Sequence, residues 1–530
     1  MLLTLKQASQ WASEHLNKNV TTANISYLIQ YGQIESKLEN GSTLIPLHSL
    51  EKYYSQSNRE KRWKNEIGDD LNWALSFEKI KEAETTKHVH RLHPYKGKFI
   101  PQLVEYFLDG HIDDFKQEAY FQPGDIVLDP FCGSGTTLVQ ANELGMHAIG
   151  IDISAFNAFI SNAKVGTFNF VHLYEKSQEI TAALRNFVAK SGIAEFESKL
   201  AESLTEFNNQ YFPVSFKRQV RMGEIDQKKY GAEKETTFLG TYHQLVAEYQ
   251  IDIQMPTDSA RFMKQWYLPG VKAEIDFVHN EIRKVGDTSI QKALMLILSR
   301  TIRSCRATTH ADLGTLREPI TTTYYCRKHG KVCKPLFSIL GWWERYSKDS
   351  IERWIEFSKL KTDTFQHCLT GDSRTIDIFA MLRKENSQFA DTAQKQQIKG
   401  ILTSPPYVGL INYHEQHAYA YDLFGFKRLD ELEIGPLFRG RGREARESYV
   451  HGVAEVFKNC KRFLADDFDI FVVANDKFNM YPTIAEMAGM HIVNQHKRPV
   501  LNRTEKNRET AYPETIFHLK KARKKLGSIS

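Results

Sequence analysis

The chain of 530 residues has few cysteines and no long apolar run. Its six cysteines are too few and too scattered for a disulfide framework, so we expect reduced thiols in a reducing compartment. No stretch of about eighteen apolar residues occurs, and the amino terminus lacks the apolar core of a secretory signal. We therefore expect a cytosolic, cytoplasmic protein with no membrane segment.

The chain also has little excess of charge of either sign. The formal net charge is +6, which does not by itself predict a nucleic-acid partner, because local clusters of charge matter more than their sum. The hydrophobic fraction of 41% and the charged fraction of 25% are typical of a globular protein. Since 530 residues exceed the size at which one core stops growing, we expect two or three domains.

Residues 125–141 combine a buried strand, a glycine turn and the start of a helix. An apolar run ends at Leu128, Gly133 and Gly135 permit a turn that a Cβ would obstruct, and Thr136 can cap the helix that follows. Such turns often hold a phosphate or a nucleotide, although some are only tight connections. The turn alone is therefore a weak indication of a ligand site, and other residues must point to the same site.

Acidic residues end three strand-like runs. Asp129 ends the first run, and Asp152 ends the run 148–152, where a carboxylate suits the hydroxyl pair of a ribose. Asp372 follows a third run that starts at Phe365. Asp372 is either a ligand-binding acid or an ordinary helix cap.

Strands alternate with helices in two separated parts of the chain, which predicts an α/β fold with a doubly wound, mainly parallel sheet. The intervening segment has a mostly helical pattern, and it is too long to be a connection within a sheet. We expect it to be an inserted domain. Its charge-rich surface is either a solvated face or, since this segment is the largest candidate, the part that recognises a target sequence. The expected domains are 1–60, 85–165 joined with 365–525, and 170–360.

Residues 1–60 contain two short helical patterns, separated by a polar turn at 17–19 and followed by Gly32 and a β-like segment. This pattern resembles the excisionase-like winged-helix modules with a helix-turn-helix. The resemblance places five residues of the second helix against DNA: Thr21, Thr22, Asn24, Ser26 and Tyr27. The alternative is a small domain that packs on the rest of the chain or on another protein. Residues 56–80 are polar, as in a linker.

A second motif, Thr403-Ser-Pro-Pro-Tyr407, directly follows a buried strand. Together with Asp129-Pro-Phe-Cys-Gly-Ser-Gly135 it resembles the S-adenosylmethionine-dependent DNA methyltransferases that modify exocyclic amino groups, cytosine N4 or adenine N6. The resemblance implies a Rossmann-like fold, S-adenosylmethionine as cofactor and double-stranded DNA as partner. It implies these cofactor-binding residues: Tyr95, Lys96, Asp129, Phe131, Gly133, Gly135, Asp152 and Asp372. The alternative for residues 90–104 is a basic loop before a helix.

The second motif suits methyl transfer to an aromatic amine, which is a poor nucleophile because its lone pair is delocalised. The hydroxyl of Ser404 and the carbonyl of Pro405 can accept both amine hydrogens, and the two prolines fix these acceptors in place. Tyr407 offers a flat face on which an extruded base can stack, since a target inside a duplex cannot reach the cofactor. We expect Ser404, Pro405, Pro406 and Tyr407 to be catalytic.

Serine at the first position of the motif resembles the cytosine-N4 enzymes more than the adenine-N6 enzymes, which more often have Asp or Asn. The leading interpretation is a site-specific DNA methyltransferase that forms N4-methylcytosine, in a restriction-modification system with a cognate endonuclease. The alternatives are an adenine-N6 methyltransferase, an RNA or protein-glutamine methyltransferase, and a DNA-binding regulator with an inactive methyltransferase fold.

Basic residues gather in two further segments. Arg306 and Arg327 belong to a stretch with interleaved tyrosines, and Arg439, Arg441 and Arg443 belong to a glycine-bearing loop. Both segments are suited to DNA phosphates. Residues 408–422, before the loop, should be helical.

Cys326, His329 and Cys333, with Cys305 or His310, have the ligand types of a tetrahedral zinc site. Their spacing is irregular and no Cys-x-x-Cys pair occurs, which favours buried structural cysteines without a metal.

Overall fold

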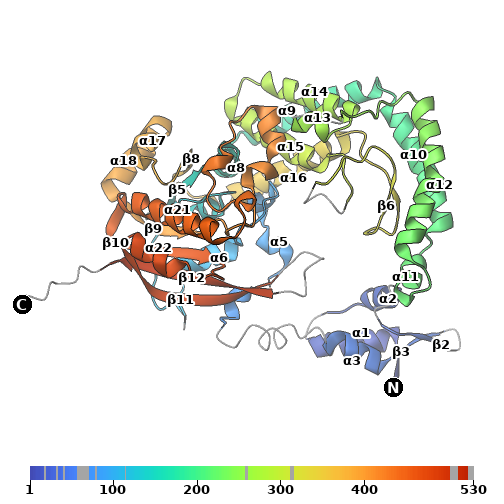
Figure 1. The fold of residues 1–530 in the computed structure, drawn as a ribbon, viewed down its shortest axis with the longest axis horizontal. Helices are drawn as coiled ribbons and strands as arrows, with labels where there is room; N and C mark the ends of the chain where they lie inside the picture. The colour runs from blue at the N-terminus through green and yellow to red at the C-terminus, as the bar shows by residue number, and fades with distance from the viewer. Residues whose placement is uncertain are drawn as a thin grey trace, which may run out of the picture.

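The computed structural model describes residues 1–16, 19–30, 34–39, 42–55, 71–77, 80–113, 115–256, 261–310, 316–501 and 511–522. Most of the expected turn at 17–19, Gly32 and most of the expected linker at 56–80 lie outside these residues. Figure 1 shows a twisted sheet with helices on both sides and further helices, α10 and α12 among them, that extend away from it. Within the described ranges, no helix is long and apolar enough to cross a membrane.

The central sheet has seven strands in the order β11-β12-β10-β9-β4-β5-β8. The strands are β4 (Ile126–Asp129), β5 (His147–Asp152), β8 (Gln366–Thr370), β9 (Ile398–Thr403), β10 (Leu464–Ala474), β11 (Met490–Leu501) and β12 (Ala511–Lys521). Strand β12 runs antiparallel to both its neighbours, whereas the pairs from β10 to β8 are parallel. The predicted doubly wound, mainly parallel sheet is confirmed.

The direction of winding reverses between β4 and β9. The chain builds outward from β4 through β5 to β8, and then returns to place β9 on the other side of β4. In open α/β sheets, ligands bind beside such a reversal, at the carboxyl ends of the strands. The ends of β4 and β9 are Asp129 and Thr403, so the glycine turn and the Ser-Pro-Pro-Tyr motif meet at this edge.

Helices cover both faces of the sheet because alternate strand residues point to opposite sides. Val127 of β4 enters one apolar core, while Ile126 and Leu128 enter the other. The Val127 face is covered by α6 (Pro101–Leu108), α7 (Thr136–Glu143) and α8 (Ala155–Val165). The opposite face is covered by α17 (Ile378–Glu385), α18 (Ser387–Gln396), α21 (Arg443–Lys461) and α22 (Tyr481–Met487).

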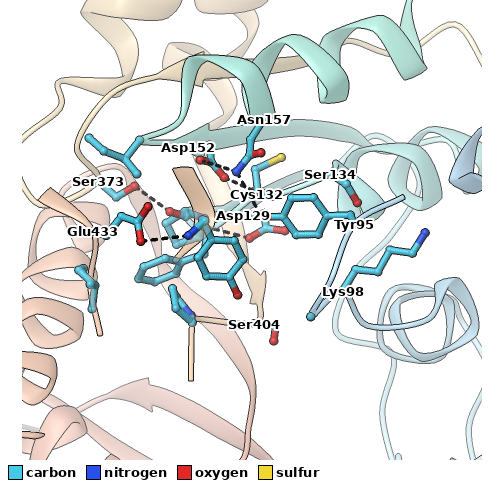
Figure 2. Close-up of a pocket in the computed structure, with 18 of the residues that line it drawn as sticks. Tyr95, Lys98, Asp129, Cys132, Ser134, Asp152, Asn157, Ser373, Ser404 and Glu433 are labelled. Carbon is cyan, nitrogen blue, oxygen red and sulfur yellow. Dashed lines mark hydrogen bonds between the residues drawn. The ribbon is translucent and has the colours of Figure 1, made fainter. Parts of the chain in front are cut away.

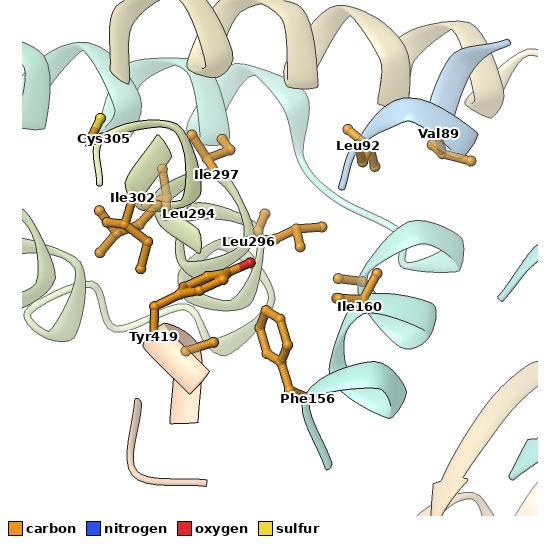
Figure 3. Packing of buried hydrophobic residues seen from close by; sticks show 14 of the residues in the cluster. Val89, Leu92, Phe156, Ile160, Leu294, Leu296, Ile297, Ile302, Cys305 and Tyr419 are labelled. Carbon is orange, nitrogen blue, oxygen red and sulfur yellow. The ribbon is translucent and has the colours of Figure 1, made fainter. Parts of the chain in front are cut away.

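The segment predicted as an insertion is mostly helical. Its helices are α9 (Phe170–Ala189), α10 (Ile193–Tyr211), α11 (Phe216–Met222), α12 (Gln227–Glu248), α13 (Phe262–Gln265), α14 (Pro269–Arg283), α15 (Thr288–Ser304) and α16 (Leu340–Ser358). All of them except α11 contribute residues to one continuous core with the Val127 face of the sheet. Figure 3 shows this junction, with Ile297 and Ile302 of α15 near Phe156 of α8 and Tyr419.

Several short elements connect these parts. They are η1 (Ala74–Ser76), α5 (Glu82–Thr85), η2 (His88–Arg91), the antiparallel pair β6 (Tyr324–Cys326) and β7 (Lys331–Cys333), α19 (Tyr413–Gln416), α20 (Ala418–Phe424), η3 (Asp430–Leu432) and η4 (Leu437–Arg439).

The amino-terminal unit has a small core of its own. It contains β1 (Leu2–Thr4), α1 (Leu5–Leu16), α2 (Thr22–Gln30), β2 (Lys37–Glu39), β3 (Ser42–Pro46) and α3 (Leu47–Ser55), with the sheet order β1-β3-β2. Ile25 and Leu28 lie on one side of α2 and pack in this core. The residues expected to meet DNA are exposed: Thr21, Thr22, Asn24, Ser26 and Tyr27.

The helix predicted over 408–422 is wrong in its first part, because only α19 and α20 are helical there. Gly409 has a φ of 64°, and its N–H donates to the carbonyl of Gly435 at 2.9 Å. A Cβ on Gly409 would lie 2.5 Å from the carbonyl oxygen of Gly440. The chain therefore turns tightly against the basic loop before α19 begins.

Candidate functional site

The glycine turn after β4 is fixed by conformation and by close packing. Gly133 and Gly135 have φ values of 53° and 75°, a region that favours glycine. A Cβ on Gly133 would lie 3.1 Å from the hydroxyl of Tyr95, and one on Gly135 would lie 2.9 Å from the hydroxyl of Ser161. Side chains at these positions would therefore displace the neighbours on which the turn rests.

A pocket that is open at its mouth lies at the carboxyl ends of the strands (Figure 2). It is lined by most of the predicted cofactor and catalytic residues: Tyr95, Asp129, Phe131, Gly133, Asp152, Asp372, Ser404 and Pro406. The others are not among its lining residues: Lys96, Gly135, Pro405 and Tyr407.

Lys98, and not Lys96, is among the residues that line the pocket. Its Nζ donates to the carbonyl of His90 at 2.7 Å, and burial lowers the pKa of Lys98 to about 8. Lys96 is exposed, and partial burial together with the charges of Arg303 and Arg306 lowers its pKa.

Asp152 is held at the end of β5 by the turn and by the start of α8. Its carboxylate accepts the N–H groups of Gly133 and Ser154, both at 2.8 Å, and Nδ2 of Asn157 at 3.1 Å. Burial raises the pKa of Asp152 to about 6, against the opposing effect of these donors. These donors fix the orientation of the carboxylate, and its pKa of about 6 means that it changes protonation state just below neutral pH.

Asp129 joins β4 to β9 and α7. Its two carboxylate oxygens accept the hydroxyls of Thr403 at 2.6 Å and Thr137 at 2.7 Å. The side chain is 1% exposed, and burial raises the pKa of Asp129 to about 6. Although it lines the pocket, its oxygens are already occupied in positioning the strand that carries Ser404.

Asp372 lies after β8, where Arg374 binds its carboxylate in a two-point contact at 2.9 and 2.7 Å. The next residue, Ser373, donates to the carbonyl of Pro130 at 2.7 Å and so ties this loop to the glycine turn. Both Asp372 and Ser373 line the pocket.

Two buried polar atoms in the pocket wall have no hydrogen-bond partner among the described residues. They are Oγ of Ser134 and Oδ1 of Asn157. Buried polar atoms are nearly always satisfied in native proteins, so a polar ligand that completes these bonds fits the pocket. Figure 2 shows both residues on the same side of the pocket as Tyr95.

The Ser-Pro-Pro-Tyr motif leaves the end of β9 at the pocket. Ser404 and Pro406 line it, and Pro405 is buried beneath them. Tyr407 is held through its hydroxyl, which donates to Oε1 of Glu514 at 2.5 Å. Glu514 in turn accepts Nη2 of Arg498 at 2.7 Å.

The five predicted DNA-binding arginines differ in exposure. Arg306 is only 7% exposed, and its Nε donates to the carbonyl of Arg303 at 3.0 Å. The other four are exposed: Arg327, Arg439, Arg441 and Arg443. Leu437 and Phe438 of the basic loop are also exposed, at 50% and 56%.

The predicted metal-binding candidates lie together. The ligand atoms of Cys326, His329 and Cys333 lie within 4.8 Å of one another and of a ligand atom of His310. Cys305, the other residue considered, is buried in the main core instead.

Comparison with known proteins agrees with this geometry. A family model described as DNA methylase, N6/N4 type, matches residues 15–164. The chain is 43% identical over 524 residues to the type II methyltransferase M.MjaII of Methanocaldococcus jannaschii, covering 98% of this chain and 97% of that protein. The chain belongs to the N6/N4 family of DNA methylases. The methyltransferase also matches shorter parts of two relatives.

One relative is the type II methyltransferase M.BsoBI of Geobacillus stearothermophilus, 33% identical over 101 residues, which cover 19% of this chain and 18% of that protein. The other is the type II methyltransferase M2.DpnII of Streptococcus pneumoniae, 35% identical over 106 residues, which cover 20% of this chain and 38% of that protein.

Methyltransferases of this family use S-adenosylmethionine as methyl donor. The pocket of this methyltransferase fits that molecule, because it offers unsatisfied polar atoms on Ser134 and Asn157, a carboxylate on Asp152 and a side-chain-free surface at Gly133. The donor supplies an electrophilic methyl group on a positively charged sulfur. A wall that contains buried acids suits that charge.

Many lining residues of the methyltransferase were not predicted from its sequence, among them Ser134, Tyr413 and Glu433. Glu433 accepts the N–H of His414 at 2.8 Å, and the residue is 6% exposed. No sequence pattern marks Glu433, since a loop far from the known motifs carries it. Ser134 could have been predicted to line the pocket from its position between the two glycines of the turn.

Proposed function

We propose that this methyltransferase transfers a methyl group to the exocyclic N4 of cytosine in double-stranded DNA, after the base has rotated out of the duplex. The position of Ser404 is the observation that carries the proposal. It lines the pocket at the end of β9, and it offers a neutral hydroxyl where a carboxylate or an amide would favour adenine.

The chain's own residues can orient the amine. The hydroxyl of Ser404 and the carbonyl of Pro405 accept the two amine hydrogens, which turns the nitrogen lone pair towards the donor. Because Pro405 is buried and Pro406 has a fixed φ, these acceptors need little rearrangement during the reaction. Alignment is the main requirement, and no strong general base is needed, since the attacking amine is neutral and loses its proton afterwards.

The extruded base would stack on Tyr407. The hydrogen bond to Glu514 restrains the tilt of the ring, and the Glu514–Arg498 ion pair is itself buried, with side chains 8% and 6% exposed. A pre-set stacking surface lowers the cost of ordering the base.

Two exposed surfaces support DNA binding. The loop with Arg439, Arg441 and Arg443 follows the tight turn at Gly409 and brings positive charge close to the motif. Helix α2 leaves Asn24 and Ser26 exposed, while its Ile25 and Leu28 are buried. We propose that the loop contacts phosphates near the flipped base and that the amino-terminal unit adds a helix-turn-helix contact.

By likeness to the type II relatives, we further propose that the enzyme protects DNA in a restriction-modification system with a cognate endonuclease. Adenine N6 is the competing target within the same chemistry.

Nucleoside analysis by mass spectrometry separates these alternatives. DNA methylated by the purified enzyme should yield N4-methylcytosine, and the Ser404→Ala variant should yield none while still binding the donor. N6-methyladenine instead would refute the choice of base. Absence of any methylated nucleoside, with the donor bound, would favour a DNA-binding regulator.

A further inference from the structure

The short ribbon of β6 and β7 contributes no residue to the lining of the pocket. It carries Cys326 and Cys333, and His329 lies in the turn between the strands. The ligand atoms of these residues and of His310 all lie within 4.8 Å of one another. Two sulfur and two imidazole ligands are a donor set characteristic of structural zinc.

Strand pairing places both thiols on one face of the ribbon. Tyr324 pairs with Cys333, and Cys326 lies two residues beyond Tyr324 on the same strand. Because side chains alternate along a strand, Tyr324, Cys326 and Cys333 share a face. The two cysteines are therefore diagonal neighbours across the pair.

The opposite face of the ribbon is already docked. Tyr325 stacks on Phe212 with ring centroids 5.4 Å apart. The backbone N–H and carbonyl of Val332 both bond to Asn208 of α10 at 3.0 Å. Among the residues that the structure describes, the apolar cluster of the cysteine face consists of Tyr324, the two cysteines and the partly buried Ile320. Packing on α10 supports one face of the ribbon, whereas the cysteine face buries little apolar surface and would gain stability from a further link.

The turn that carries His329 brings its ring to the cysteines. Gly330 has a φ of 66° and donates its N–H to the carbonyl of Cys326 at 2.7 Å. Nδ1 of His329 lies 3.5 Å from Sγ of Cys333. This compact turn holds one thiol and one imidazole on the same side.

His310 completes the set from a separate segment, just beyond α15. Its ring centroid lies 4.4 Å from that of His329. The hydroxyl of Tyr324 lies 2.7 Å from Nδ1 of His310 and accepts the backbone N–H of His310 at 3.1 Å. A hydrogen bond to one ring nitrogen that orients the other is the usual support of a metal-binding histidine.

We propose that His310, Cys326, His329 and Cys333 bind one structural zinc ion. Two thiolates and two neutral imidazoles would give a neutral tetrahedral site. The ion would fasten the segment after α15 to the ribbon, and it would leave Arg327, Lys328 and Lys331 exposed around the site. The site lies apart from the donor pocket, so it would be structural and not catalytic.

Metal analysis of the full-length protein, purified with reduced thiols and without chelators, tests the proposal. Elemental analysis should give one zinc per chain. Cys326→Ala and Cys333→Ala should each lower this ratio at least tenfold, whereas Cys305→Ala, which removes a buried thiol of the main core, should leave it unchanged. A double Cys326→Ala and Cys333→Ala variant that keeps its zinc would overturn the site.

Cobalt titration of the wild-type chain needs no variant to fold. Co²⁺ added to the metal-free protein should give the intense visible bands of a tetrahedral ion and a sulfur-to-cobalt charge-transfer band, both abolished by stoichiometric zinc. His329→Ala should weaken these bands, and His243→Ala, at an exposed position on α12, should not. A weak octahedral spectrum, or a Cys326–Cys333 disulfide in protein that takes up no metal, would refute the proposal.

Discussion

The hydroxyl of Thr403 donates a 2.6 Å hydrogen bond to Oδ1 of Asp129. This bond connects the last residue of β9, immediately before Ser404, with the last residue of β4, immediately before the glycine turn. Thr137 binds the second oxygen of Asp129 from α7. The donor pocket and the motif at the methyl acceptor are therefore held in register by one buried carboxylate.

Replacing Thr403 by Val should destabilise the fold by about 1–3 kcal/mol, because Oδ1 of a buried carboxylate loses its shorter hydrogen bond and keeps the N–H of Phe131 at 3.2 Å. The loss should also raise the pKa of Asp129 further, since this hydrogen bond favours the charged form. Thr403→Ser keeps the hydroxyl and serves as the control in urea unfolding. If Thr403→Val had the stability of the wild type, the hydrogen bond would make no net contribution to the free energy of unfolding.

Tyr407→Phe should keep the stacking face and lose the bond to Glu514. We expect kcat to fall by about tenfold, the equivalent of one hydrogen bond, with an unchanged KM for the donor. In Tyr407→Ala, kcat should fall further, because stacking of a base on an aromatic ring contributes about 1–3 kcal/mol. Steady-state kinetics with saturating DNA measures both. Equal losses in the two variants would show that the hydroxyl, and not the ring, matters.

The sheet could be predicted because its parallel strands are buried on both faces and appear as short apolar runs, such as residues 398–403. Strand β11 was missed. It lies at the edge of the sheet, its sequence is polar, and it contains Pro499, so its extended form depends on pairing with β12.

The pocket was predicted less completely, since loop residues follow no period. Lys96 and Lys98 stand in one loop, and only packing decides which of them faces inward. The link between Tyr407 and Glu514 spans 107 positions, and no local pattern encodes it. Arg306 resembled a DNA contact by composition, yet it packs inward at the end of α15.

Gly133→Ala should weaken donor binding, because its Cβ would meet Tyr95 at 3.1 Å on the pocket wall. Gly223→Ala is a matched control, with a φ of 78° and no atom within 4 Å of the added Cβ. Both variants should lose about 1 kcal/mol of stability through the positive φ. Only Gly133→Ala should lower the affinity measured by calorimetry. Equal affinity in the two variants would count against this pocket.

Arg443→Ala should weaken DNA binding and reduce the slope of log K against log salt by about 0.9 if the side chain neutralises one phosphate. Its side chain is 87% exposed and its surface ion pair with Glu447 is weak, so the variant should keep the stability of the fold. Arg383→Ala, at an exposed arginine on α17, is the control. Fluorescence anisotropy at several salt concentrations gives both slopes, and identical slopes would exclude a phosphate contact by Arg443.

The pH dependence of donor binding should follow Asp129 and Asp152. Burial raises the pKa of each in the folded protein to about 6, from an ordinary value of 3.8. Their protonated forms therefore stabilise the fold below about pH 4, and this contribution is lost as the pH rises to about 6. The sulfonium charge of the donor favours the ionised forms. Donor affinity should accordingly rise with pH up to about 6 and then level off.

Below pH 6, binding of the donor should release protons, and affinity should fall by at most about tenfold per pH unit for each carboxylate that ionises. Calorimetry in buffers with different ionisation enthalpies measures the released protons. S-adenosylhomocysteine is the matched control, because it has the same groups with a neutral sulfur, and its affinity should depend less steeply on pH. Equal slopes for the two ligands would show that neither carboxylate senses the charge on sulfur, and that Asp129 and Asp152 act only by positioning the strands and the glycine turn.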